Sequence, residues 1–254
     1  MADLELPLTG HLQELRARLI RALIALIIAF AICYPQAETL FDFLTAPLID
    51  AANNSPEGAR LIGTGVAEAF FTRLKVSFIA ALFLALPVIL YEIWIFILPG
   101  LRKREARYGL GFVIVGSFFF IAGSAFCYAI VFDFGFPFFL TEYQKIGIEP
   151  TIRISEYLSF TSRMLLAFGI TFELPVATFF LARVGLVTHH TLINSARYAI
   201  LVTFILAAVL TPPDVVSQVL MAGPLMILYG VSIGVAYVFA VPSTRSKDQE
   251  SKED

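Results

Sequence analysis

Six long stretches of this sequence are apolar and almost free of charged side chains. A helix rises about 1.5 Å per residue, so roughly 20 apolar residues cross a hydrocarbon core of about 30 Å. A water-soluble fold is excluded, because 58% of the 254 residues are hydrophobic and only 15% are charged. The pattern predicts an all-α, polytopic membrane protein with six transmembrane helices, over residues 22–37, 76–98, 108–132, 164–182, 198–211 and from 215 onward.

The fifth apolar run is the shortest. Its 14 residues reach only about 21 Å as a helix, and Pro212 and Pro213 follow directly. The sequence therefore predicts that the last two helices are short and form a bent hairpin. Residues 1–242 are expected to form one membrane domain, and the charged residues 243–254 a disordered tail.

The distribution of basic residues sets the expected orientation. An even number of crossings places both termini on one side, and twelve of the 18 lysines and arginines fall there. Because Lys and Arg are enriched in cytoplasmic loops, both termini are expected in the cytoplasm. The first apolar run is not expected to be a cleaved signal peptide, because Asp3, Glu5 and Glu14 stand where such a peptide is basic. The N-terminus also lacks the Arg- and Ser-rich composition of a leader for import into an organelle. A bacterial or archaeal plasma membrane is the expected location.

Two loops on the opposite side, residues 38–68 and 133–155, are long enough to hold structure. In the first, Leu40, Leu44 and Leu48 recur every four residues. This period predicts a short amphipathic helix before or around Pro47. A cap on the membrane surface and a contact site for another molecule are both open as its role.

A weak internal repeat relates the second and fourth apolar runs. At an offset of 88 residues, an acidic residue, a basic residue and a Leu-Pro-Val tripeptide recur in the same order. Duplication of an ancestral unit and chance are both open as explanations. The matches join Glu68 to Glu156, Lys75 to Arg163, and residues 86–88 to 174–176.

One carboxylate, Glu173, lies in the middle of the fourth run and so near the membrane midplane. An isolated charge is costly there, so the side chain should be protonated, paired or open to water. Pro175 lacks a backbone donor and frees the carbonyl of Thr171 at the same depth. Glu173 is therefore either a structural residue satisfied by the broken backbone, or a functional group that admits water or binds a partner.

Two further carboxylates, Glu14 and Glu105, lie among basic residues on the side of the termini, and a third, Glu92, lies within the second apolar run. Glu14 precedes Arg18 by four residues, a spacing at which the two pair on one helix face. Glu105 neutralises part of a basic loop, and Glu92 is expected at the headgroup level near the end of the second run. Spacing alone favours structural roles for Glu14 and Glu105, and an interfacial position for Glu92.

No catalytic motif stands out. The sequence has no Gly-Lys dipeptide for a nucleotide-binding loop and no His-Glu-x-x-His motif for zinc. The adjacent His189 and His190 cannot share one helix face. We therefore expect no enzymatic activity, cofactor, metal or nucleic-acid partner. Cys33 and Cys127 are expected to be buried thiols, with a disulfide as the alternative.

Five segments together resemble the TatC family, the large integral membrane subunit of the twin-arginine protein translocase. The resemblance extends over residues 8–237, and its most specific parts are the Phe-Glu-Leu-Pro core and the Thr-Pro-Pro-Asp turn. The segments are HLQELRAR at 11–18, APLI at 46–49, PVILYEIW at 87–94, FGITFELPV at 168–176 and LTPPDV at 210–215.

The resemblance implies a receptor with six spans and cytoplasmic termini. Such a receptor binds signal peptides that carry consecutive arginines. It then assembles with single-span TatA- and TatB-type subunits, and with further copies of itself, to export folded proteins by the proton-motive force. The alternative is a proton-coupled secondary transporter of a small solute, which Glu173 and the proline-broken spans would suit.

The resemblance also implies roles for individual residues. A carboxylate suits recognition of arginine because it accepts the guanidinium fork in a bidentate geometry. Glu92 departs from the family pattern, in which an uncharged amide is expected, so its role stays open. The implied residues are Glu14, Glu105, Arg16 and Phe96 for the signal peptide, Pro47, Pro87 and Asp214 for assembly, Thr211 and Gln218 for a docked partner span, and Glu173 for the concave membrane face.

Overall fold

The structure, a computed structural model, describes residues 8–55, 58–97, 109–183, 185–210 and 215–240. Within these residues, six helical segments are long and apolar enough to cross a membrane. The prediction of an all-α protein with six transmembrane helices is confirmed. In chain order the elements are α1 (Leu8–Cys33), η1 (Tyr34–Gln36), α2 (Ala37–Asn53), β1 (Arg60–Ile62), α3 (Glu68–Ile97), α4 (Gly109–Phe126), η4 (Cys127–Val131), α5 (Phe132–Lys145), β2 (Thr151–Arg153), α6 (Ile154–Arg183), α7 (His189–Leu210) and α8 (Val215–Phe239).

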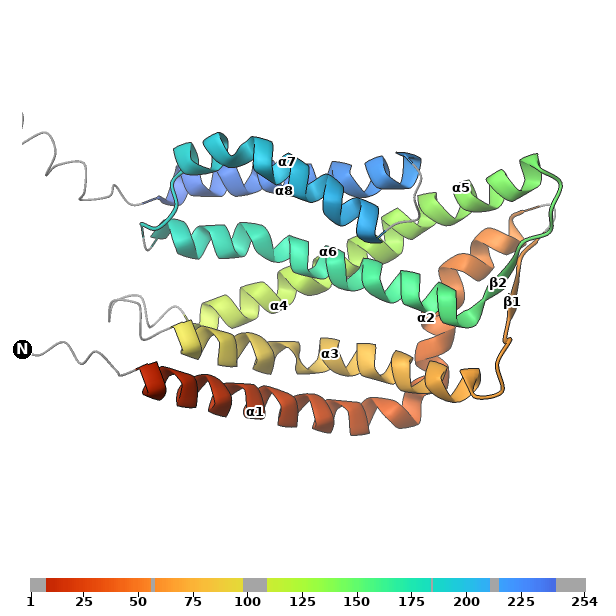
Figure 1. Cartoon of the computed structure of the whole chain (residues 1–254), viewed down its shortest axis with the longest axis horizontal. Helices are drawn as coiled ribbons and strands as arrows, with labels where there is room; N and C mark the ends of the chain where they lie inside the picture. The colour runs from red at the N-terminus through yellow and green to blue at the C-terminus, as the bar shows by residue number, and fades with distance from the viewer. Residues whose placement is uncertain (1–7, 56–57, 98–108, 184, 211–214, 241–254) are drawn as a thin grey trace, which may run out of the picture.

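The long helices lie side by side, in the order α1, α3, α6 and the α7–α8 pair from bottom to top of Figure 1, with α4 crossing between α3 and α6. The start of α1 and the end of α8 lie at the left of this view, which we call the terminal end. We call the right-hand end, with α2, α5 and both strands, the cap end. As predicted, the last two helices are short, with 22 and 25 residues against 30 in both α3 and α6.

Several predicted boundaries are wrong: α3 and α6 begin at Glu68 and Ile154, eight and ten residues before their apolar runs. Residues 133–145 were expected in a loop, but α4 continues through the π-helical turn η4 into α5. The exposed side chain of Asp133 does not interrupt this helix, whose other face buries Phe132, Phe136 and Leu140. The fifth helix begins at His189, ahead of its apolar run, because Thr188 caps it: the Thr188 hydroxyl accepts the Thr191 N–H at 3.3 Å.

The predicted amphipathic helix is α2. Its Leu44 and Leu48 are buried, and it continues through Pro47. A proline has no N–H, so Pro47 leaves the carbonyl of Phe43 without its helical donor. The hydroxyl of Tyr128 in η4 donates to that carbonyl at 2.7 Å. Pro47 and Tyr128 together therefore join α2 to the α4–α5 helix.

Two three-residue strands tie the cap end together. β1 and β2 pair in parallel, and each precedes a 30-residue helix that contains a proline. The Glu68 carboxylate joins the two strand–helix units, because it accepts the backbone N–H of Gly65 at 3.0 Å and that of Ser155 at 3.0 Å. The repeat in the sequence thus has a counterpart in space, and its origin by duplication stays a prediction.

The main hydrophobic core lies between the cap and the middle of the bundle. It joins α2, η4, α5, α6 and α8 around fully buried side chains such as Phe132, Leu158 and Phe168. Cys127 belongs to this core, and Cys33 packs in a smaller cluster between α1 and α3. Both are buried free thiols, as expected from the sequence.

Small residues let α4 and α6 approach closely. A Cβ atom at Gly123 would lie 2.6 Å from the carbonyl oxygen of Phe168, and one at Gly169 would lie 2.8 Å from the ring of Phe120. Side chains larger than glycine would therefore separate the two helices. This close crossing brings Glu173 on α6 against α4.

Candidate functional site

A charge cluster joins α1 to α3 near the terminal end. Glu14 and Arg18 form the expected ion pair on α1, with Oε1 of Glu14 3.2 Å from Nη2 of Arg18. Nη1 of Arg18 donates to Oε2 of Glu92 on α3, also at 3.2 Å. Arg21 lies 3.7 Å from the same oxygen. We call these four residues the α1–α3 charge cluster; its two positive and two negative charges balance.

Glu92 is buried between two helices and is not a solvated residue at the headgroup level. Its side chain is only 9% exposed. A buried carboxylate requires partners, and two arginines of α1 supply them. Sequence reasoning missed this pairing because it depends on which face of α3 packs on α1. The available signal was an acidic residue in one apolar run and two arginines at the start of another.

Three of the implied signal-peptide residues lie in the described helices. Because α1 and α3 run antiparallel and Arg18 is level with Glu92, Glu14 and Phe96 fall at a similar depth, one turn nearer the terminal end. Glu14 is 24% exposed, Arg16 is exposed and Phe96 is half-buried. The structure thus brings Glu14 and Phe96 to one end of an antiparallel helix pair. Glu105 lies outside the described residues.

An aromatic cluster holds α3, α4 and α6 together on the terminal half of the bundle. The rings of Trp94, Phe112 and Phe180 contact one another with all three centroid distances at 4.9 Å. The indole N–H of Trp94 is buried and has no hydrogen-bond acceptor among the described residues. The cluster fixes the end of α3 that carries Glu92 and Phe96.

Glu173 faces α4 at the close helix crossing. A Cβ atom at Gly116 would lie 3.1 Å from Oε2 of Glu173, so this glycine makes room for the carboxylate. The other oxygen, Oε1, is buried and has no hydrogen-bond partner in the described part of the chain. The hydroxyl of Thr171 does not bind Glu173 but donates to the backbone carbonyl of Ala167 at 2.7 Å. Glu173 is therefore a polar group that the surrounding side chains do not satisfy.

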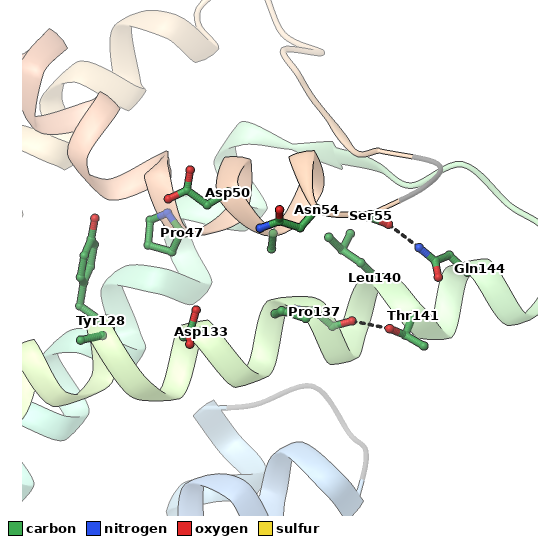
Figure 2. A pocket seen from close by; sticks show the side chains of 12 residues that line it. Pro47, Asp50, Asn54, Ser55, Tyr128, Asp133, Pro137, Leu140, Thr141 and Gln144 are labelled. Carbon is green, nitrogen blue, oxygen red and sulfur yellow. Dashed lines mark hydrogen bonds between the residues drawn. The ribbon is translucent and has the colours of Figure 1, made fainter.

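Pro47 lines a pocket of about 360 Å³ at the cap end, between α2 and the η4–α5 segment (Figure 2). Asp50 from α2 and Asp133 from α5 lie on its two sides. Gln144 donates to the hydroxyl of Ser55 and closes one end of it. The pocket lies at the opposite end of the molecule from the α1–α3 charge cluster.

The remaining implied residues lie on other helices. The side-chain amide of Gln218 donates to the carbonyl of Phe204 at 3.1 Å and so links α8 to α7. Pro87 lies inside α3 with an exposed side chain. Thr211 and Asp214 lie outside the described residues.

Six apolar helical segments among the described residues, with the buried carboxylate of Glu92 paired at a contact between two of them, define a multi-pass α-helical membrane protein. A family model described as "Sec-independent protein translocase protein (TatC)" matches residues 10–224. The chain belongs to the TatC family and is a component of the twin-arginine translocase.

Similar proteins and structures agree with this assignment. A TatC from Desulforapulum autotrophicum is 50% identical over 247 residues, which cover 97% of this chain and 88% of that protein. A TatC from Magnetococcus marinus is 43% identical over 227 residues, or 89% of this chain and 82% of that protein. A crystal structure titled as the twin arginine translocase receptor TatC is 35% identical and superposes with a TM-score of 0.80, covering 89% of this chain and 97% of that one.

Proposed function

We propose that this chain is the signal-peptide receptor of a twin-arginine translocase in a bacterial or archaeal plasma membrane. The terminal end faces the cytoplasm, where the receptor binds the paired arginines of an export signal. Folded cargo then crosses the membrane by the proton-motive force. The chain itself has no enzymatic activity and needs no cofactor.

The observation that carries this proposal is the contact between Glu14 and Arg18. The Glu14 carboxylate already binds a guanidinium at 3.2 Å and remains partly exposed. A twin-arginine peptide offers the same chemical group. Arginine suits such a site better than lysine, because its planar fork donates two parallel hydrogen bonds to one carboxylate.

Arg18 acts in this proposal as an internal occupant of the peptide site. An arriving arginine competes with Arg18 for Glu14. Glu92 keeps hold of Arg18 during this exchange, because it binds the other guanidinium nitrogen at 3.2 Å. The partly buried Arg18 therefore does not lose all its carboxylate partners when Glu14 changes partner, which lowers the energy needed for the exchange.

Glu105 supplies the second carboxylate, so two acidic side chains meet two signal arginines. The HLQELRAR motif carries Glu14 and Arg16, and Phe96 follows the PVILYEIW motif by two residues; we assign the three to one surface. The antiparallel register of α1 and α3 agrees with it, because it sets Glu14 and Phe96 at a similar depth.

TatA- and TatB-type single-span subunits are the proposed partners within the bilayer. Thr211 and Gln218 are the proposed docking positions for a partner span, and Pro47, Pro87 and Asp214 contribute to assembly, including self-association in a larger complex. The bond from Gln218 to Phe204 supports a structural link between α8 and α7 at this point. Glu173 is the proposed intramembrane polar group that either holds water or transfers protons.

Site-specific crosslinking tests the proposal. With Glu14 and Glu105 intact, a photoreactive residue beside each of them, at position 13 or 106, should capture a labelled twin-arginine signal peptide, and a twin-lysine peptide should be captured much less. A photoreactive residue at Glu142, on α5 at the cap end, is the matched control and should capture neither. Equal capture at all three positions would contradict the receptor assignment. A solute transporter is not expected to bind this peptide, so selective capture also distinguishes the receptor from the proton-coupled solute transporter.

A further inference from the structure

Two basic side chains on neighbouring helices in the cap half lack an acidic partner. Lys75 on α3 donates to the hydroxyl of Ser159 on α6, and that hydroxyl donates to the carbonyl of Ser155. Arg163 lies one turn after Ser159 on α6 and so on the same face of that helix as the hydroxyl that Lys75 binds. Two like charges are therefore held together with two protons of Lys75 still available.

The other basic residues of the cap half are all neutralised. Four ion pairs join Arg60 to Glu149, Arg73 to Glu38, Lys145 to Glu142 and Arg153 to Glu156. Within the described part of the chain, neither Lys75 nor Arg163 forms such a pair. The two unpaired cations are thus neighbours on α3 and α6, since Lys75 binds the hydroxyl one turn from Arg163, which concentrates positive charge on this part of the surface.

The surface around this cation pair is apolar. Phe71 and Phe78 lie one turn before and one turn after Lys75 on α3, and both are exposed. Ile170 lies two turns after Arg163 on α6 and is also exposed. A soluble anion would leave these apolar side chains exposed, whereas the acyl chains of a lipid would bury them.

The depth of the pair suits a lipid headgroup. Lys75 lies seven residues into α3, about 10 Å from its start, and Arg163 lies nine residues into α6, about 13 Å from its start. Basic side chains of this length extend toward the headgroup region when their backbone lies just inside the hydrocarbon. Phe78 and Ile170 lie further toward the membrane centre, where acyl chains run.

We propose that Lys75 and Arg163 bind the phosphate of an anionic phospholipid in the leaflet at the cap end. Ser159 orients the Lys75 ammonium between the two helices. The acyl chains lie along Phe78 and Ile170. The lipid thereby joins α3 to α6 on the face where the two helices have no ion pair of their own in the described structure.

Native mass spectrometry of the full chain in detergent, with added phosphatidylglycerol, tests the proposal. Wild-type protein should retain one molecule, and the Lys75→Gln/Arg163→Gln variant should bind it about tenfold more weakly. The matched control is Arg60→Gln/Lys145→Gln, which removes two positive charges from the same end and should bind as wild type does. Equal retention by wild type and the Lys75/Arg163 variant would overturn the proposal.

Two further arms identify the ligand. Phosphatidylcholine carries the same phosphate with no net charge and should be retained several-fold less; equal retention would overturn the requirement for an anionic lipid. Inorganic phosphate at the same concentration should not raise the melting temperature as phosphatidylglycerol does, and an equal rise would assign the site to soluble phosphate instead. Should the double variant fail to fold, the exposed Arg163→Gln alone should weaken lipid retention, and unchanged retention would contradict the proposal.

Discussion

Arg18 and Glu92 stand 74 positions apart in the chain, yet Nη1 of Arg18 lies 3.2 Å from Oε2 of Glu92. The second terminal nitrogen of the same guanidinium binds Glu14. The two carboxylates therefore share one cation. A change at Glu92 alters the strength with which Arg18 holds Glu14, and hence the availability of Glu14 to an external arginine.

Glu92→Gln should weaken twin-arginine peptide binding about tenfold. The amide keeps the size of the side chain but not its charge, so Arg18 turns more strongly to Glu14 and competes with the peptide. Peptide affinity of the purified protein in detergent measures the effect. Adding Arg18→Gln to this variant removes the competitor and should restore much of the affinity. Tighter binding by Glu92→Gln alone would contradict the shared-cation interpretation.

Glu14→Ala and Glu105→Ala should each abolish crosslinking of the signal peptide while the protein still inserts and folds. A hydrogen bond to a charged group contributes about 1.5–3 kcal/mol, so losing one lowers the affinity about ten- to hundredfold. Glu142→Ala, an exposed acidic residue at the cap end, is the control and should bind normally. Normal peptide binding by both Glu14→Ala and Glu105→Ala would rule out the receptor function.

Glu173→Gln and Glu173→Leu separate three roles for Glu173. If the carboxylate holds water, Gln should be milder than Leu, since an amide still forms hydrogen bonds and leucine does not. If it transfers protons, Gln should fail as badly as Leu. If it is only structural, Leu should raise the melting temperature and leave export unchanged, because it removes a buried polar oxygen without a partner. Export rate and melting temperature, measured on both variants, decide among the three.

Tyr128→Phe should lower the free energy of unfolding by about 0.5–1.5 kcal/mol, because the carbonyl of Phe43 then loses its donor. Tyr143→Phe, at an exposed tyrosine of α5, is the control and should have little effect. Thermal unfolding in detergent measures both changes.

A double-mutant cycle tests the physical reason for this effect. Pro47→Ala gives residue 47 an N–H that can reach the Phe43 carbonyl within the helix. The loss caused by Tyr128→Phe should therefore be smaller in the Pro47→Ala background. An equal loss in both backgrounds would show that the hydroxyl stabilises the cap in some other way.

Much of the fold could be predicted because its signals are local. Apolar run lengths predicted the six spans, and a four-residue spacing predicted the Glu14–Arg18 pair. The helical period of Phe132, Phe136 and Leu140 was also present in the sequence. Asp133 nevertheless led to the prediction of a loop there, because the charge content of a segment does not show which way each side chain faces.

The contacts that the sequence could not predict join distant segments. Glu92 pairs with Arg18, and Tyr128 with the carbonyl of Phe43, only after α3 packs on α1 and η4 on α2. No periodicity within one segment encodes the face that another helix covers. The same holds for Gly116, whose part in accommodating Glu173 depends on how closely α4 crosses α6.

The strand pair and the Glu68 carboxylate join the starts of α3 and α6, whereas at the terminal end these helices meet through side chains alone in the described structure. A 30-residue helix is about 45 Å long. If such a helix rotated by about 10° about its start at the strands, its far end would move by about 8 Å. Glu92 on α3 and Phe180 on α6 lie toward these far ends, so the α1–α3 charge cluster and the aromatic cluster hold α3 and α6 against such a swing.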